Sequence, residues 1–322
     1  MGLKIMCNEM KALSKEHFKY IKGIAILAVI VAHVGNFSGK TWFTPLGGIG
    51  VALFLFCSGY GLLTSYYQKG LKQFWLNKLF SIYLPFALVE IIAAIIYRHS
   101  FLNVLLDLVF IKRLNPLGWY MQYLAACYIL FYVVVRWISN RSIRFLVWGI
   151  VAGLTFVLCP NLQAEQAISF IGGLLLAEMN HAEKFSINKK KTVCIGGVAI
   201  IAAIGLLALK QLPIVRAQSH YLITLLNLLL KSGAAMGIIC IAAVWQPMRK
   251  LFLCLGRLSY PLYLVHGYFM AIIGKNLFGN YYVSSLVMLL ISFVLAIGLN
   301  VMVEALGKRK EKCYDTKSIS NQ

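Results

Sequence analysis

The stretch KGIAILAVIVAH, residues 22–33, sets ten almost purely apolar residues between a lysine and a histidine. It lies within a longer apolar run over about residues 20–38, close to the roughly 20 residues that a helix needs to cross a membrane. A helix that only anchors a protein in lipid gains nothing from a buried imidazole, which needs a partner there. The histidine is therefore either a tolerated polar residue between packed helices or a functional one.

The composition of the whole chain is that of a membrane protein. Of its 322 residues, 60% are hydrophobic and only 13% are charged, and the mean hydropathy is +0.78. Soluble domains have roughly 45–50% apolar and about 25% charged residues. This balance leaves no room for a separate soluble domain, and we expect a polytopic membrane protein.

Apolar runs divide the chain into a series of expected spans. We expect an all-α, polytopic membrane helical bundle of about ten transmembrane helices. Their approximate ranges are 20–38, 46–66, 79–97, 117–138, 143–159, 164–181, 192–210, 220–244, 251–274 and 283–306. The segment 101–111 is too short to span and predicts an interfacial or re-entrant helix. We expect the charged side chains of this region to be solvated, or else to form part of a lid over an external acceptor site. They are Arg98, His99, Asp107, Lys112 and Arg113.

The net charge of +21 is explained by topology rather than by nucleic acid. If the N-terminus lies inside, the termini and the cytoplasmic connections collect 23 of the 31 Lys and Arg residues. Such an alternation from loop to loop is the positive-inside pattern of membrane proteins. Both termini are therefore predicted to be cytoplasmic.

Three regions follow from this reading: a basic cytoplasmic N-terminus at 1–19, a transmembrane domain at 20–306, and a polar cytoplasmic tail at 307–322 that we expect to be disordered. The first apolar run lacks a small-residue cleavage site, so it predicts a retained helix rather than a signal peptide. The eight cysteines show no paired spacing, and neither a disulfide framework nor a metal site is implied.

Lys22 and His33 lie on one face of the expected first helix. At 100° per residue, their separation of eleven residues is only about 20° more than three full turns, and it spans roughly 16 Å along the axis. Lys22 then lies at the cytoplasmic edge and His33 about halfway through the bilayer. Lys22 alone is also explained as a lysine that extends its ammonium to the interface. Together the two predict a cation at the cytoplasmic mouth of a path that leads to a proton-transferring imidazole.

Three further ionisable residues stand out inside the expected spans, where charge is costly: Glu90, Lys231 and His266. An ion pair between Glu90 and Lys231 is the simplest explanation of both, although Glu90 could instead orient His33. His266, close to Tyr263, is equally explained as a packing or hydrogen-bonding residue.

Several motifs, in order along most of the chain, resemble those of the acyltransferase-3 family of membrane acyltransferases. The first is the basic residue, ten residues and histidine of residues 22–33. GGIGVALFLFCSGYGLL resembles the second helix of the family, with its Ser-Gly-aromatic motif at Ser58, Gly59 and Tyr60. Ser58 is also explained by close helix packing, which Ser-Gly pairs favour in membranes.

The later motifs extend the resemblance to the end of the chain. FWLNKLFSIYLPF is similar to the basic run that leads into the third helix, and NPLGWYMQYLAACYILFY to the aromatic-rich fourth span with Trp119 and Tyr128. LGRLSYPLYLVHGYF is similar to the family's SYPLYLxH segment. Two positions depart from the pattern. Lys22 replaces an arginine and loses its bidentate fork, and the family's two arginines three residues apart correspond to Lys78 and Ser81, so the second charge is lost.

The resemblance implies transfer of an acyl group, most often acetyl, from cytoplasmic acetyl-CoA to a hydroxyl of a cell-surface or lipid-linked glycan. His33 would be the catalytic base, while Lys22 and Lys78 would hold the phosphates of the acyl donor. Supporting roles fall to Glu90, Lys231, His266, Ser58, Tyr60, Trp119 and Tyr263. The acyl-CoA is a co-substrate, and no permanently bound cofactor is implied.

Two other classes of function also fit intramembrane Lys, Glu and His residues. One is an ion-coupled transporter of a small solute, which would show internal repeats and unwound helices. The other is a membrane assembly subunit without chemistry of its own. In each case we expect a multi-pass protein of a cell membrane, in bacteria the cytoplasmic one, surrounded by lipid and without nucleic acid as a partner.

Overall fold

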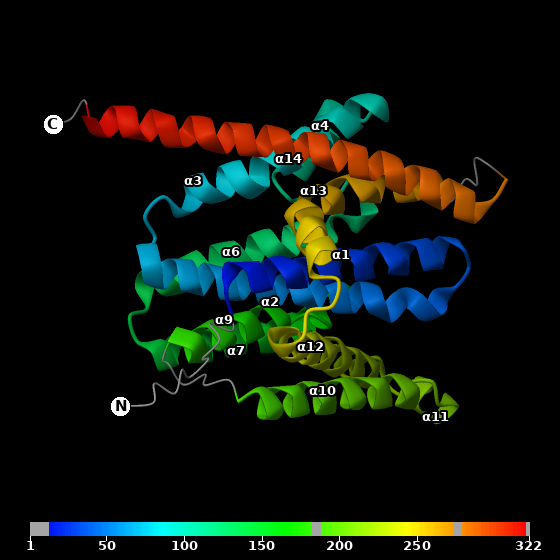
Figure 1. Cartoon of the computed structure of the whole chain (residues 1–322). Helices are drawn as coiled ribbons and strands as arrows, with labels where there is room; N and C mark the ends of the chain where they lie inside the picture. The colour runs from blue at the N-terminus through cyan, green and yellow to red at the C-terminus, as the bar shows by residue number, and fades with distance from the viewer. Residues whose placement is uncertain (1–12, 182–187, 274–278, 320–322) are drawn as a thin grey trace, which may run out of the picture. The chain divides into compact units, whose positions relative to one another are not determined.

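The computed structural model of the chain describes residues 13–181, 188–273 and 279–319 (Figure 1). These ranges are helical almost throughout and contain no strand. In chain order the elements are α1 (Lys15–Phe37), η1 (Thr41–Phe43), α2 (Thr44–Lys69), α3 (Phe74–Lys78), η2 (Leu79–Tyr83), α4 (Leu84–Ile96), α5 (Phe101–Leu108), η3 (Pro116–Gly118), α6 (Trp119–Trp137), α7 (Arg141–Leu158), α8 (Asn161–Ala164), α9 (Ser169–His181), α10 (Lys189–Leu209), α11 (Pro213–Arg216), α12 (His220–Val244), α13 (Arg249–Ile273) and α14 (Tyr281–Ile319).

Within the described ranges, seven helical segments are long and apolar enough to cross a membrane. They are Lys15–Phe37, Thr41–Lys69, Phe74–Ile96, Arg141–Leu158, Lys189–Leu209, His220–Val244 and Tyr281–Leu306. The other three expected spans correspond to α6, α9 and α13. Of these, α9 has only 13 residues, fewer than the roughly 20 that a full crossing needs. The all-helical class is confirmed, and the chain is a multi-pass membrane protein.

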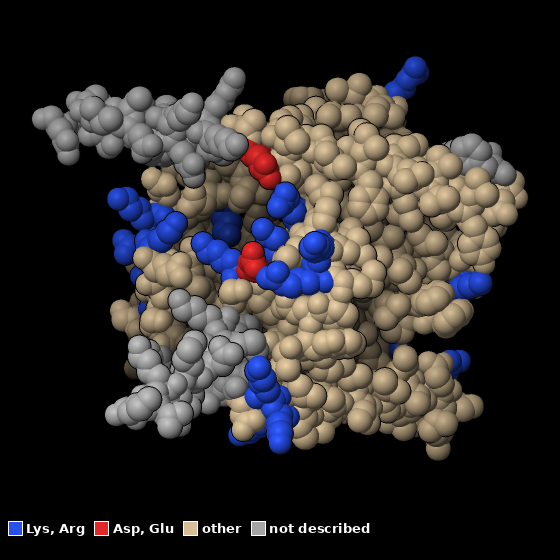
Figure 2. All heavy atoms as spheres, viewed as in Figure 1, with Lys and Arg blue, Asp and Glu red and all other residues tan. Residues whose placement is uncertain are grey.

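The surface fits this environment. Figure 2 shows a face that is mostly free of charge, on which Lys and Arg side chains far outnumber Asp and Glu. Large apolar side chains are exposed along the helices, as at Ile95, Leu146, Ile201 and Val294. A soluble protein would bury such stripes, whereas hydrocarbon solvates them at no cost.

The chain divides into two compact units, and α1, α6 and α13 each contribute residues to both. The first unit comprises Met1–Val29, Pro45–Gly70 and Phe131–Arg257. In it α10 and α12 pack side by side (Figure 1), and α2 crosses α9 closely. A Cβ added to Gly59 of α2 would lie 2.2 Å from the Phe170 carbonyl oxygen, and one added to Gly173 of α9 would lie 2.1 Å from the Phe56 carbonyl oxygen. Glycine at both positions therefore permits this backbone contact.

The second unit comprises Ile30–Thr44, Leu71–Leu130 and Leu258–Gln322. Its element η2 is a π-helical turn between α3 and α4, where the ordinary i→i−4 ladder is interrupted. The Tyr260 hydroxyl of α13 donates to the Ile82 carbonyl in this turn, at 2.6 Å. The Tyr83 hydroxyl donates to the Leu108 carbonyl of α5, at 3.2 Å. These two hydrogen bonds connect the turn to α13 and to α5.

Two expectations about peripheral segments need correction. The short helix expected at 101–111 is present as α5, and its apolar residues Phe101 and Leu102 are exposed, as in an interfacial helix. Asp107, however, is buried and not solvated. The polar tail from residue 307, expected to be disordered, continues the backbone of α14 as a helix to Ile319.

Candidate functional site

His33 lies near the C-terminal end of α1. The helix runs without interruption from Lys15 to Phe37, so Lys22 and His33 belong to one regular helix, as expected from their spacing. His33 is four residues from the last residue of α1, about 6 Å along its axis. The imidazole is half-buried. Part of its surface is therefore accessible, and it lies toward the end of α1 that we predict to face outward.

His266 of α13 lies next to His33. Their ring centroids are 5.5 Å apart, and the ring planes are inclined at 44°. His266 has 0% of its surface exposed. Its Nδ1 lies 2.7 Å from the Tyr263 carbonyl oxygen and 3.0 Å from the Leu262 carbonyl oxygen. The structure thus brings together two of the histidines singled out in the sequence, in the second unit.

The loop before α6 packs against this part of α13 and orients it. The Tyr263 hydroxyl donates to the Leu117 carbonyl at 2.6 Å, and the Tyr263 ring lies 5.5 Å from the His266 ring. The buried Asn115 accepts a hydrogen bond from the Leu117 N–H at 2.9 Å. A Cβ added to Gly267 would lie 2.6 Å from Asn115 Nδ2, so glycine is needed next to His266. The imidazole of His266 is therefore surrounded by a fixed framework.

Lys22 lies in the first unit, on the N-terminal half of α1. Its side chain is half-buried. The Lys22 ammonium interacts electrostatically with the Cys57 thiol of α2. Among the described residues, no carboxylate and no hydrogen-bond acceptor is paired with the Lys22 ammonium. A half-buried cation without a counter-charge is suited to bind an anionic ligand.

Lys78 lies at the end of α3, directly before the π-helical turn. Its ammonium lies over the Tyr128 ring, 4.6 Å from the centroid, and 5.8 Å from the centroid of the Phe74 ring. Ser81, at the second position of the expected basic pair, is exposed, and its hydroxyl donates to the Asn77 carbonyl at 2.6 Å. Ser81 is thus satisfied within its own helical turn.

Glu90 has other partners than those expected. This buried carboxyl of α4 accepts a hydrogen bond from the Tyr268 hydroxyl of α13 and interacts with the Asp107 carboxyl of α5. Asp107 Oδ1 accepts from the Leu114 N–H at 3.3 Å. Burial raises the pKa of Asp107, because a charged carboxylate loses its hydration there. Two adjacent buried carboxyls are stabilised when one of them keeps a proton.

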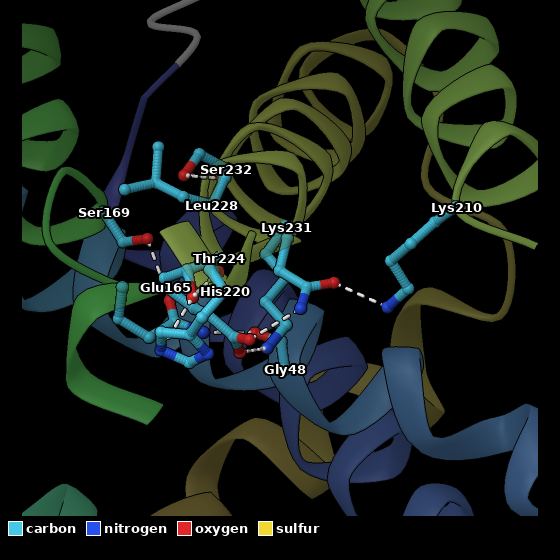
Figure 3. Close-up of polar contacts among 11 residues, drawn as sticks. Gly48, Glu165, Ser169, Lys210, His220, Thr224, Leu228, Lys231 and Ser232 are labelled. Atoms are coloured by element: carbon cyan, nitrogen blue, oxygen red, sulfur yellow. Dashed lines mark hydrogen bonds and ion pairs between the residues drawn. The ribbon is translucent and has the colours of Figure 1, made fainter. Parts of the chain in front are cut away.

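Lys231 of α12 is paired with Glu165, so the expected pair with Glu90 is wrong. Glu165 lies just after α8, and its two oxygens accept from the Lys231 ammonium and from Asn227 Nδ2, the latter at 2.6 Å. Asn227 Oδ1 in turn accepts from the Lys210 ammonium at 2.6 Å. Figure 3 shows this network with Gly48 beside the Lys231 side chain, where an added Cβ would lie 2.3 Å from the lysine Cε. The geometry explains Lys231 as part of a buried structural network.

Three other residues that the sequence singled out are held by packing. The Tyr60 hydroxyl donates to the Leu13 carbonyl at 3.1 Å and accepts from Asn180 Nδ2 at 2.9 Å, so this tyrosine joins α2 to α9 and to the backbone just before α1. Trp119 is buried at the start of α6, against the edge of Tyr120. Ser58 is half-buried next to the close contact at Gly59.

A groove of about 570 Å³ lies between α4, α13 and α14. Apart from Tyr97 and Tyr268, its lining consists of aliphatic side chains, methionine and glycine. Such a lining suits hydrocarbon rather than a nucleotide or a sugar, whose polar groups would remain unpaired there.

Our reading of the sequence missed Glu165 and Asn227, and it misjudged Asp107. Glu165 lies inside the expected span 164–181, where an acidic residue is itself a signal for a buried partner. No pattern in the sequence connects it with Lys231, 66 positions later. Asp107 lies on a short amphipathic segment, where a solvated carboxylate is the simpler interpretation.

Comparison with known proteins gives a family for the whole arrangement. A family model described as an acyltransferase domain, that of acyltransferase-3, matches residues 16–304. The match extends from the second residue of α1 into α14 and so includes Lys22, His33, Lys78 and His266. No curated protein and no solved structure matches the chain.

Proposed function

Because the chain belongs to the acyltransferase-3 family, we propose that it transfers an acetyl group from cytoplasmic acetyl-CoA to a hydroxyl of a cell-surface or lipid-linked glycan. We place it in the cytoplasmic membrane of a bacterium, in contact with lipid. The observation that carries the proposal is a half-buried imidazole, His33, next to a second imidazole and on the same helix as Lys22, a cation without a partner among the described residues.

The donor end of the reaction is assigned to the basic side chains. CoA carries several phosphates, and its charge is matched by the Lys22 ammonium, which has no partner among the described residues. Lys78 is the second cation that we assign to the donor. The helix between Lys22 and His33 spans roughly 16 Å, over which the pantetheine arm can extend toward the imidazole.

The chemical step is assigned to His33. Its neutral imidazole takes the proton of the acceptor hydroxyl as the oxygen attacks the thioester carbonyl. The C–O bond forms, the C–S bond breaks, and the proton passes to the CoA thiolate, so the reaction needs neither oxidant nor metal to balance. General base catalysis of this kind contributes typically about 10²- to 10⁴-fold to a rate.

The test uses membrane vesicles from expressing cells with radiolabelled acetyl-CoA. We expect wild-type protein to label the glycan fraction and His33→Ala to lower the initial rate by roughly 100-fold or more. The exposed His220 provides the matched control, and His220→Ala should retain activity. Equal labelling by a folded His33→Ala protein would contradict the assigned base. Solute uptake in proteoliposomes without any acyl donor would favour a transporter instead.

A second prediction concerns the donor. We expect Lys22→Gln to raise the KM for acetyl-CoA by roughly 10-fold, because a hydrogen bond to a charged group contributes about 1.5–3 kcal/mol. Lys15→Gln, an exposed lysine at the start of the same helix, should leave this KM unchanged. An unchanged KM in Lys22→Gln would show that Lys22 only extends to the interface. A subunit without chemistry would show no saturation with acetyl-CoA in any variant.

A further inference from the structure

The two ring nitrogens of His266 differ in their contacts: Nδ1 is hydrogen-bonded, whereas Nε2 has no hydrogen-bond partner among the described residues. A backbone carbonyl only accepts hydrogen bonds, so the contacts of Nδ1 with the carbonyls of Tyr263 and Leu262 place the ring hydrogen on Nδ1. In the neutral ring, Nε2 then carries a lone pair and can only accept. The tautomer of His266 is therefore set by its own helix.

The free nitrogen is buried without a partner. Within the described ranges Nε2 makes no hydrogen bond, although it is inaccessible to water. An acceptor left in this way costs free energy, so the fold has a reason to supply a donor. His33 is the adjacent imidazole, with its ring centroid 5.5 Å away. Two imidazoles at this centroid separation are within reach of an N–H···N hydrogen bond, in which the two nitrogens lie roughly 3 Å apart.

We propose that His266 is a positioning residue for His33. Its Nε2 accepts a hydrogen bond from one ring N–H of His33, which fixes the tautomer in which the other nitrogen of His33 is the free base. The same bond stabilises the imidazolium that forms when His33 takes the proton. A base oriented by a third group is a general arrangement in acyl transfer. The inference rests on the function proposed for His33.

The other polar groups near His33 and His266 have partners of their own. Tyr263, whose ring also lies against His266, donates its hydroxyl to the Leu117 carbonyl and so is engaged elsewhere. Glu90 and Asp107 interact with each other and with Tyr268. His266 itself has no exposed surface, whereas His33 is half-buried, so a substrate meets His33 first.

Two substitutions separate an acceptor at Nε2 from simple packing. His266→Asn places its amide near Nδ1 and offers nothing at Nε2, whereas His266→Gln reaches the position of Nε2 with a carbonyl oxygen that accepts. We expect His266→Asn to lower the rate of acetyl transfer in vesicles by roughly 10- to 100-fold, as the loss of an orienting partner does elsewhere. His266→Gln should stay within about threefold of wild type, because it restores the acceptor.

The pH–rate profile distinguishes the two roles of His266, because it would not change if His266 only packed against His33. In His266→Asn the acid limb should shift to lower pH, because protonated His33 loses an acceptor; in His266→Gln it should not. In a His33→Ala background, His266→Asn should cause no further loss, since the two act through one interaction. Near-wild-type rates in both variants would overturn the proposal, and so would equal losses with an unmoved profile. An active His33→Ala protein would instead overturn the proposed function.

Discussion

A single glycine explains the Ser58-Gly59 pair in structural terms. The sequence alone allowed Ser58 a supporting role at the site, but it also allowed this pair to serve close packing. The structure shows the packing: the Gly59 backbone lies against the Phe170 carbonyl, and Gly173 repeats the contact in the opposite direction. Close contact between α2 and α9 thus requires the absence of a side chain at two positions.

We therefore expect Gly59→Ala to destabilise the protein. A Cβ 2.2 Å from a backbone oxygen forces the helices apart, and strain of this kind costs about 1–3 kcal/mol. Gly61→Ala, two residues later on the same helix, has nothing within 4 Å of its Cβ and should be neutral or slightly stabilising. Thermal unfolding in detergent measures both. Equal melting temperatures for the two variants would show that α2 and α9 separate without cost.

The sequence could predict the relation between two site residues only where they lie close together along the chain. The relation of Lys22 to His33 follows from helix periodicity and was correct, because both residues belong to one helix. The partner of Lys231 was wrong, since Glu165 comes from a distant segment that only tertiary packing brings near. The contact between His33 and His266, more than 200 positions apart, has the same origin and was not predicted.

At the scale of the element, α5 shows how one buried side chain fixes a short helix. The eight residues of α5 cannot be stable alone, because isolated helices of this length do not form in water. Asp107 connects α5 to Glu90 of α4, and the Leu114 N–H donates to the same carboxyl. The periodicity of 101–111 was sufficient to predict a short helix, but the burial of Asp107 depends on α4.

The stability of this attachment should fall as the pH rises. Burial raises the pKa of Asp107 above its ordinary value of about 3.9, so the folded protein binds this proton more tightly than the unfolded chain. Such a group contributes stability below its unfolded pKa, and the contribution is lost as the pH rises through the folded pKa. Asp107→Asn stays neutral, and its thermal stability in detergent should depend less on pH and exceed that of wild type at alkaline pH.

A nearby exposed residue provides the control for this prediction. Lys112, whose ammonium donates to Asn103 Oδ1 at 2.8 Å on the surface, can be changed to Gln without altering the buried pair. Lys112→Gln should keep the pH dependence of the wild type. If Asp107→Asn also keeps it, Asp107 does not hold a proton in the folded state.

At the scale of the whole molecule, the topology predicted from the loop charges requires the short helix α9 to cross the membrane. Its 13 residues are about 20 Å long, less than the roughly 30 Å of the hydrocarbon core. A crossing at α9 therefore requires the irregular backbone before it to cover the remaining depth, which membranes tolerate only where protein surrounds that backbone. There Gln166 Nε2 donates to the Gly48 carbonyl at 2.9 Å, the Ser169 hydroxyl donates to Gln166, and Glu165 binds Lys231. These contacts satisfy the polar groups of the irregular backbone, as a crossing at α9 would require.

Single cysteines in a background without the eight native ones decide the point. With both termini cytoplasmic and ten crossings, Asn161→Cys should react with a membrane-impermeant maleimide in intact cells, because it precedes α9 on the outer side. Lys190→Cys, at the start of α10, should react only after the membrane is permeabilised. Both positions are exposed, so burial cannot explain a difference. Labelling of Lys190→Cys in intact cells would mean that α9 does not cross, and the buried network at Glu165 would then belong to a re-entrant segment.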